Sequence, residues 1–283
     1  MDLNITIIQS ELHWESVSEN LVMFSEKINA IPKKTDLIVL PEMFNTGFSM
    51  QSKELSETME GETVSWMMKQ SKKAEAAIVG SLIIKEDNQF YNRLIWAEPN
   101  GKIKTYDKRH LFRMANEDAH FTAGSERLII TYKGWRICPL ICYDLRFPVW
   151  SRNIKLPVDK NHINPLQSNQ NVNHTLSQHS TTAFDLLIFI ANWPEVRKIP
   201  WSKLLDARAI ENQCYVVGVN RVGTDGKGFS YSGNSAVINP KGEAISNLPE
   251  SKNCTETVTI SLVELNDFRT VFPVEMDADD FTL

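Results

Sequence analysis

The sequence predicts a mixed α/β fold, because short β-rich runs alternate with amphipathic stretches along the chain. The run "DLIVLPE" at 36–42 is apolar without polar alternation, as is typical of a central strand buried on both faces. Before this run, apolar residues recur at steps of three and four, which places them on one face of a helix. These residues are Val17, Leu21, Phe24 and Ile28.

The first elements of the chain follow from these runs. A strand at 3–8 should precede the helix that begins near Val17. Pro41 should end the apolar strand, because proline removes a backbone donor. Glu42 is then left at the exit of that strand.

A predicted hairpin places a lysine at a second strand exit. A helix near 62–75 should lead into a strand at 76–85. The segment 89–108, "QFYNRLIWAEPNGKIKTYDK", reads as two strands, and the Asn-Gly pair at 100–101 is a strong turn signal between them. Lys108 follows the second strand.

The remaining chain continues the alternation of strands and helices. Helices are expected after 146 and between 200 and 213. Strands are expected at 127–132, 135–141, 185–191, 214–220, 232–239 and 255–260.

One segment breaks this pattern. Residues 153–182 are poor in large apolar side chains and rich in Asn, Gln, Ser and His, so they can bury little surface to offset the entropy lost on ordering. We interpret them as a surface insertion in a single domain that spans 1–283. The histidines at 162, 174 and 179 are spaced too irregularly to predict a metal site, and we expect none.

Composition and charge exclude several classes of protein. The 42% hydrophobic content suffices for a sizeable core, and 30 basic against 35 acidic residues form no basic block that would follow a nucleic-acid backbone. No apolar run approaches the roughly 18 to 20 residues of a membrane span, and the start lacks the layout of a signal peptide. We therefore expect a cytoplasmic protein without a nucleic-acid or membrane partner.

The four cysteines raise the question of a nucleophile. Cys138, Cys142, Cys214 and Cys254 lack paired CxxC spacing, which favours reduced thiols over zinc ligands or disulfides. Cys142, in "PLICYDLRFP", lies where an apolar run meets a charged one. It is either a small buried residue or a nucleophile at the end of a strand.

A nucleophilic thiol needs a base and a stabiliser for the charge that develops on the substrate. His110 and His120 lie in a polar loop, and no Cys/His protease signature surrounds Cys142. Glu42 is a better candidate base, because a partly desolvated carboxylate accepts protons more readily. Lys108 could supply the positive charge.

Three motifs together resemble the nitrilase, or carbon-nitrogen hydrolase, superfamily. Glu42 lies in "LPEMFNTGF", Lys108 in "YDKRHLF" and Cys142 in "LICYDLRFP", in the chain order of the Glu, Lys and Cys motifs of that family. The segments at 186–194, 204–223 and 231–243 also resemble later parts of the family. The resemblance implies a four-layer αββα sandwich with the three residues at one end of the paired sheets.

The resemblance also implies a mechanism. Glu42 would take the proton of Cys142, whose thiolate would attack an amide carbonyl, while Lys108 and the backbone N–H of Tyr143 would hold the oxyanion. Ammonia would leave, and water activated by Glu42 would hydrolyse the thioester. This chemistry requires no cofactor.

A second glutamate is common between the Lys and Cys motifs of such proteins, and Glu117 in "FRMANEDAHF" matches it. Its expected role is to orient Lys108 and to tune Glu42. The alternative is a solvated loop carboxylate, with Asp118 and Glu126 as neighbours that could be mistaken for it.

Within the superfamily, the motifs resemble most closely the bacterial ω-amidases, which hydrolyse the terminal amide of 2-oxoglutaramate and succinamate. Such a substrate carries a carboxylate, for which Arg113 is the candidate partner. Arg113 could instead pair with Glu117 or Asp118. Arg146, four residues after Cys142, is the competing candidate, but we favour for it a structural ion pair with Asp144 or another carboxylate.

Phe48 and Trp193 could form the walls of a narrow acyl pocket, although core packing explains either residue equally well. A related hydrolase of carbamoyl compounds, other amides or nitriles is the alternative function, and a noncatalytic binding protein is the next. Superfamily members are usually dimers or larger, so we expect a homo-oligomer. Phe268, Phe272 and Phe281 could pack on a partner subunit.

Overall fold

The protein is described from a computed structural model that covers residues 1–154 and 182–279 in detail. Most of the expected insertion, residues 155–181, lies outside the described residues, and so does Phe281. No helix in the described part of the chain is both long and apolar enough to cross a membrane.

A six-stranded sheet contains the first strands of the chain, in the order β13-β1-β2-β3-β4-β5. β1, β2 and β3 are parallel, and β4 lies antiparallel between β3 and β5. β5 therefore runs in the same direction as β2. The strands are β1 (Asp2–Gln9), β2 (Leu37–Val39), β3 (Ala77–Glu86), β4 (Gln89–Ala97), β5 (Ile103–Asp107) and β13 (Cys254–Ser261).

A five-stranded sheet, in the order β12-β9-β8-β7-β6, packs against the first. Its central strands β7, β8 and β9 are parallel. The strands are β6 (Ile130–Tyr132), β7 (Trp135–Ile141), β8 (Leu186–Ala191), β9 (Tyr215–Asn220) and β12 (Ala236–Ile238). A separate two-stranded ribbon consists of β10 (Val222–Thr224) and β11 (Ser230–Ser232).

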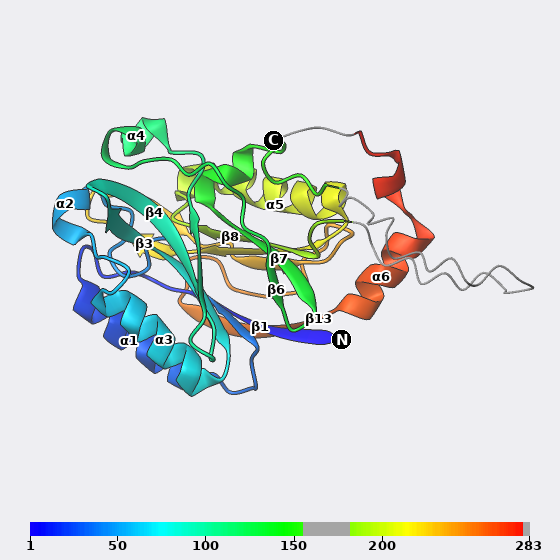
Figure 1. Cartoon of the computed structure of the whole chain (residues 1–283), viewed down its shortest axis with the longest axis horizontal. Helices are drawn as coiled ribbons and strands as arrows, with labels where there is room; N and C mark the ends of the chain where they lie inside the picture. The colour runs from blue at the N-terminus through cyan, green and yellow to red at the C-terminus, as the bar shows by residue number, and fades with distance from the viewer. Residues whose placement is uncertain (155–181, 280–283) are drawn as a thin grey trace, which may run out of the picture.

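Helices cover the outer faces of both sheets (Figure 1). α1 (Val17–Asn29) and α3 (Glu62–Ala74) lie side by side on the six-stranded sheet, whereas α5 (Lys198–Asn212) packs on β9 and β12 of the other sheet. The layers therefore follow the expected order αββα. The shorter helical segments are α2 (Ser52–Leu55), η1 (Arg113–Ala115), α4 (Glu117–His120), η2 (Cys142–Arg146), η4 (Glu195–Arg197), α6 (Leu262–Val271) and η5 (Val274–Asp277).

The short strand β2 explains why its sequence is continuously apolar. Leu37 and Val39 belong to the core between the two sheets, whereas Ile38 and Leu40 belong to the core under α1 and α3. Successive side chains of a strand point to opposite faces, so a central strand needs apolar residues at every position. The predicted burial on both faces is confirmed.

The prediction of a helix after residue 146 is wrong. The 3₁₀ helix η2 begins at Cys142 itself and ends at Arg146, and residues 148–151 form turns. Pro148 disfavours helical backbone at the residue before it, which prevents η2 from continuing. The strand expected at 232–239 is also interrupted, since only 236–238 join the five-stranded sheet. α6 was not predicted.

Candidate active site

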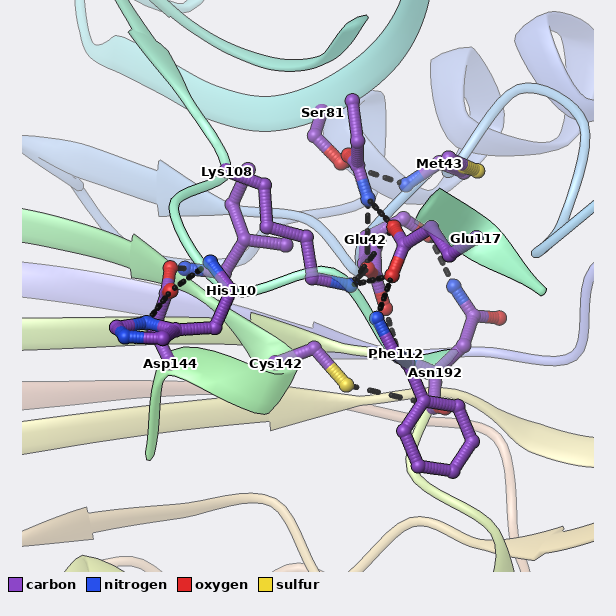
Figure 2. A network of polar contacts seen from close by, with 12 residues as sticks. Glu42, Met43, Ser81, Lys108, His110, Phe112, Glu117, Cys142, Asp144 and Asn192 are labelled. Atoms are coloured by element: carbon purple, nitrogen blue, oxygen red, sulfur yellow. Dashed lines mark hydrogen bonds and ion pairs between the residues drawn. The ribbon is translucent and has the colours of Figure 1, made fainter. Parts of the chain in front are cut away.

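Four strand ends bring polar residues to one edge of the paired sheets. Glu42 follows β2 and Lys108 follows β5, at the same edge because the two strands run in the same direction. Cys142 follows β7, and Asn192 follows the parallel neighbour β8. Figure 2 shows these side chains converging between the sheets.

Cys142 occupies a sharp turn between β7 and η2. Its φ is 43°, in the left-handed region that non-glycine residues rarely adopt, and its side chain is buried but lines a cavity. Sγ lies 4.0 Å from the backbone oxygen of Asn192. Tyr143 is the second residue of η2, so its backbone N–H has no partner within that helix.

Asp144 holds this turn in place. It is fully buried and accepts hydrogen bonds from the backbone N–H of Ile141 at 3.1 Å and from the hydroxyl of Tyr106 at 2.7 Å. The backbone N–H of His110 donates to Asp144 at 3.0 Å, and His110 Nδ1 lies 2.8 Å from the same carboxylate. His110 also stacks on Phe147, so its ring is engaged in the support of the turn.

Glu42 is fully buried and held by three donors. Its Oε1 accepts hydrogen bonds of 2.8 Å from Asn92 Nδ2 and from Lys108 Nζ. Its Oε2 accepts the backbone N–H of Asn192 at 2.8 Å, and the side chain of Asn192 donates to the backbone oxygen of Glu42. Both carboxylate oxygens are therefore fixed by residues of β4 and of the segments that follow β5 and β8.

Lys108 lies between two carboxylates (Figure 2). Its Nζ is 2.8 Å from Glu42 Oε1 and 2.9 Å from Glu117 Oε2, and all three side chains are fully buried. Nζ also lies 5.1 Å from the ring centroid of Phe48. Nζ lies within hydrogen-bond distance of both oxygens of Glu117, at 3.0 and 2.9 Å, so one of its three N–H groups can turn to another acceptor when a single N–H serves both of these oxygens.

Glu117, at the start of α4, is not a solvated loop residue. It accepts the backbone N–H of Phe112 at 2.6 Å and Asn92 Nδ2 at 3.2 Å, in addition to Lys108. Asn92 therefore donates to both Glu42 and Glu117. The neighbour Asp118 faces outward and pairs with Arg113.

These charges change proton affinities in the site. Burial raises the pKa of Glu117; the charge of Lys108 opposes this and that of Glu42 adds to it. Burial lowers the pKa of Lys108, but the charges of Glu117 and Glu42 outweigh it and raise that pKa above its ordinary value. Burial and the charge of Glu42 raise the pKa of the Cys142 thiol well above its ordinary value, against the effect of Lys108. The thiol is therefore protonated at neutral pH and must lose its proton to a base before it reacts.

A cavity of about 210 Å³ opens beside these residues. Cys142 and Lys108 line it, as do Phe48 and Trp193, which the sequence singled out as candidate walls. The other lining residues are Phe112, Met114, Ala115, Tyr143, Arg146, Asn192, Pro194, Arg197, Asp225, Lys227, Phe229 and Tyr231.

The structure does not bring Arg113 to this cavity. Its side chain is 86% exposed and pairs with Asp118 at 3.4 Å. Arg146, expected in a structural ion pair, lines the cavity instead, and its Cζ lies 5.1 Å from the ring centroid of Trp193. Asp144 is occupied by other donors, and Arg146 forms no ion pair with any described residue.

The family model for the carbon-nitrogen hydrolase matches residues 4–270. This chain belongs to that family. Within the described residues of this carbon-nitrogen hydrolase, no group of His, Cys, Asp or Glu side chains is arranged to hold a metal ion.

Two relatives match most of the length of the chain. Omega-amidase YafV from Escherichia coli (strain K12) is 41% identical over 281 residues, which are 99% of this chain and 98% of YafV. The 2-oxoglutaramate amidase from Bacillus subtilis (strain 168) is 32% identical over 248 residues, 87% of this chain and 86% of the relative.

A solved structure has the same fold. XC1258 from Xanthomonas campestris, a CN-hydrolase superfamily protein with an arsenic adduct in its active site, matches with a TM-score of 0.90 and 39% identity. The match covers 100% of this chain and 99% of that chain. The predicted nitrilase-type sandwich is confirmed.

Sequence reasoning about this hydrolase missed Asn92 and Asn192 as members of the site. Asn92 lies in the middle of β4, where its neighbours Leu94, Ile95 and Trp96 are buried and apolar. A polar residue inside a buried strand needs hydrogen-bond partners. The asparagine in this apolar run could therefore have been recognised from the sequence as a residue with buried polar contacts. Asn192 contacts the Glu42 carboxylate and the Cys142 thiol through its backbone, and a residue type does not reveal such contacts.

Proposed function

We propose that the chain is an ω-amidase that hydrolyses the terminal amide of a small dicarboxylate monoamide, such as 2-oxoglutaramate or succinamate. One observation carries this proposal: Cys142 and the Glu42-bound Lys108 line a cavity that is also lined by Arg146, whose guanidinium has no ion-pair partner among the described residues. The cluster supplies the nucleophile, the base and the positive charge that attack on an amide requires. The guanidinium can bind the carboxylate at the other end of the substrate. Both relatives described above are amidases by name.

In the first half of the proposed reaction, Glu42 accepts the thiol proton as Sγ of Cys142 attacks the amide carbon. Among the described residues only the backbone N–H of Asn192 donates to Oε2 of Glu42, which leaves a lone pair for this proton. The oxyanion is held by the remaining N–H of Lys108 and by the backbone N–H of Tyr143. Glu42 then protonates the leaving nitrogen, the C–N bond breaks, and ammonia departs from a thioester.

In the second half, water attacks the thioester carbon and transfers a proton to Glu42. The tetrahedral intermediate collapses with cleavage of the C–S bond, Glu42 returns its proton to Sγ of Cys142, and the carboxylic acid leaves. Glu117 and Asn92 act as positioning residues, because they hold Lys108 and Glu42 and have no need to contact the substrate.

Substrate recognition follows from the lining of the cavity. Arg146 takes the role first assigned to Arg113 and binds the substrate carboxylate, since an arginine on an aromatic face keeps its donor edge free. Phe48 and Trp193 exclude water from the acyl chain and limit its length.

Ammonia release tests this proposal. We expect turnover of 2-oxoglutaramate and succinamate, weaker turnover of glutamine and asparagine, and none of an aliphatic nitrile or a carbamoyl compound. Cys142→Ala should reduce the rate by at least about 10⁴-fold, and mass spectrometry should detect an acyl adduct on Cys142 of the parent protein. Preferred hydrolysis of the nitrile or carbamoyl compound would favour the related hydrolase, and the absence of any turnover or adduct would favour a noncatalytic protein.

We also propose that the single domain assembles as a homodimer or larger homo-oligomer in the cytoplasm. Val271 and Phe272 are 84% and 60% exposed at the end of α6, which supports burial against a second subunit. Phe268 is only partly buried and contacts Lys241. All four cysteines are free, as in a reducing compartment. Sedimentation equilibrium of the parent and of Phe272→Asp tests the assembly.

A further inference from the structure

A second guanidinium lines the same cavity as Arg146. Arg197 is the last residue of η4, half-buried, and its side chain forms no hydrogen bond or ion pair with any described residue. Its Cζ lies 5.3 Å from the ring centroid of Phe112. A half-buried arginine without a carboxylate partner, on the wall of a substrate cavity, is available to a ligand oxygen.

The wall around Arg197 links it to the nucleophile and to Arg146. The ring of Phe112, which faces the Arg197 guanidinium, packs edge-on against the ring of Tyr143, with 5.1 Å between the ring centroids. Tyr143 directly follows Cys142 in the chain. On the other side, Trp193 Nε1 donates to the backbone oxygen of Arg197 at 2.8 Å, and the face of the same indole carries Arg146. Arg197 therefore contacts two aromatic residues of the cavity lining, Phe112 and Trp193, and the second of these also contacts Arg146.

The charge of the lining disfavours a cationic group on the substrate. Apart from Lys108, which Glu42 and Glu117 neutralise, the described residues that line the cavity include three cations, Arg146, Arg197 and Lys227, and one carboxylate, Asp225. Asp225 accepts hydrogen bonds from the Tyr231 hydroxyl and from the backbone N–H groups of Lys227 and Phe229. The one acidic group is thus occupied by protein donors.

We propose that Arg197 binds a carbonyl oxygen next to the substrate carboxylate, so that the enzyme selects 2-oxo acid monoamides over unsubstituted and 2-amino ones. This inference rests on the proposed ω-amidase function. A 2-oxo acid presents a carboxylate and an adjacent carbonyl oxygen, which two guanidiniums can share as donors. An unsubstituted acid leaves Arg197 without its acceptor, and a 2-ammonium group meets like charge.

Three substrates of equal length test the inference: 2-oxoglutaramate, glutaramate and glutamine, which differ only at the carbon next to the carboxylate. Arg197→Met keeps the length of the side chain and removes the donors. We expect kcat/KM for 2-oxoglutaramate to fall roughly 10- to 100-fold, as for the loss of one charged hydrogen bond. The value for glutaramate should stay within about threefold, and most of the change should lie in KM.

Three further variants sharpen the result. Arg146→Met should lower kcat/KM for both 2-oxoglutaramate and glutaramate, because both carry the carboxylate. Lys198→Met, next in the chain to Arg197 but paired with Glu250 outside the cavity, should change neither. Arg197→Lys keeps a charge without the planar fork, and we expect it to lose most of the preference for the 2-oxo substrate; it decides the question if Arg197→Met does not fold.

The possible failures are distinct. A parent enzyme that releases ammonia from none of the three substrates overturns the proposed function. A parent that hydrolyses them, with Arg197 variants that lose equal activity on glutaramate and 2-oxoglutaramate or lose none, overturns the inference alone.

Discussion

The backbone N–H of Asn192 donates a hydrogen bond of 2.8 Å to Oε2 of Glu42, although 150 residues separate the two in the chain. The backbone oxygen of Asn192 lies 4.0 Å from Sγ of Cys142. One peptide segment at the end of β8 therefore contacts both the candidate base and the candidate nucleophile. This arrangement ties the relative position of the two groups to the pairing of β7 with β8.

Glu42→Gln should make the thiol more acidic and yet stop turnover. The charge of Glu42 raises the pKa of Cys142, so its removal lowers that pKa and increases the thiolate fraction at pH 8. Alkylation of Cys142 by iodoacetamide should accelerate, while ammonia release falls by roughly 10²- to 10⁴-fold for loss of the base. Cys138, whose pKa burial raises to about 12, serves as an unreactive internal reference in the peptide map. Slower alkylation together with retained turnover would contradict the assignment of Glu42 as the base.

Lys108→Met should destabilise the protein most strongly at neutral pH. The change leaves Glu42 and Glu117 buried without the ammonium between them, at a cost of about 3–5 kcal/mol in the free energy of unfolding. The pKa of Glu117, already raised by burial, should rise further, so the folded state binds more protons than the unfolded state between about pH 5 and 7.

Stability of the Lys108→Met variant should therefore recover as the pH falls from 7 to 5.5. Urea unfolding at the two pH values measures the change. Lys198→Met removes an exposed lysine and should follow the parent at both pH values. A Lys108→Met variant that becomes still less stable at pH 5.5 would show that the two carboxylates do not share its charge.

Asn92→Leu should lower turnover without removing any group that contacts the substrate. It deletes the amide donor shared by Glu42 and Glu117. For each buried carboxylate, the loss of a donor should lower the free energy of unfolding by about 1–3 kcal/mol. We expect kcat to fall roughly 10- to 100-fold with little change in KM.

Asn212→Leu provides the matched control for Asn92→Leu. Asn212 is also buried, and its side chain donates to the backbone oxygens of Ser151 and Arg208 rather than to Glu42 or Glu117. Its loss should reduce stability but leave the kcat of the folded protein unchanged. Equal kcat values for the two variants would indicate a purely structural role for Asn92.

Arg146→Met should affect only substrates that carry a carboxylate. Succinamate and butyramide have the same chain length, but only succinamate ends in an anion, so kcat/KM should fall roughly 10- to 100-fold for succinamate alone. Arg113→Met, on the exposed loop, should alter neither substrate. Loss of succinamate activity in the Arg113 variant would return the carboxylate site to that loop.

The positions of Glu42, Lys108 and Cys142 could be predicted because each follows a β-rich run, and the structure places all three at one edge of the sheets. Arg113 and Arg146 could not be told apart in this way. Both lie in charged segments, and only the turn geometry decides that Arg113 is exposed while Arg146 lines the cavity. Such geometry depends on distant contacts, including the bonds of Asp144 to Tyr106 and His110.

The hydrogen-bond partners of Glu42 could not be predicted from the sequence for the same reason. Its partners Asn92 and Asn192 are 50 and 150 residues away. Asn92 lies on β4, two strands from β2 in the same sheet, and Asn192 follows β8 of the other sheet, so they approach Glu42 only in the folded protein. Local sequence patterns describe the periodicity of single elements, so they carry little information about which element ends meet.

The buried cluster of two glutamates and one lysine has a consequence for the end of the reaction. With both acids ionised, it carries one net negative charge at the place where the amide is cleaved. The substrate arrives there with an uncharged amide, whereas the proposed product would ionise into a second anion beside Glu42. Mutual repulsion would then expel the diacid, so hydrolysis itself would drive the active site to empty for the next cycle.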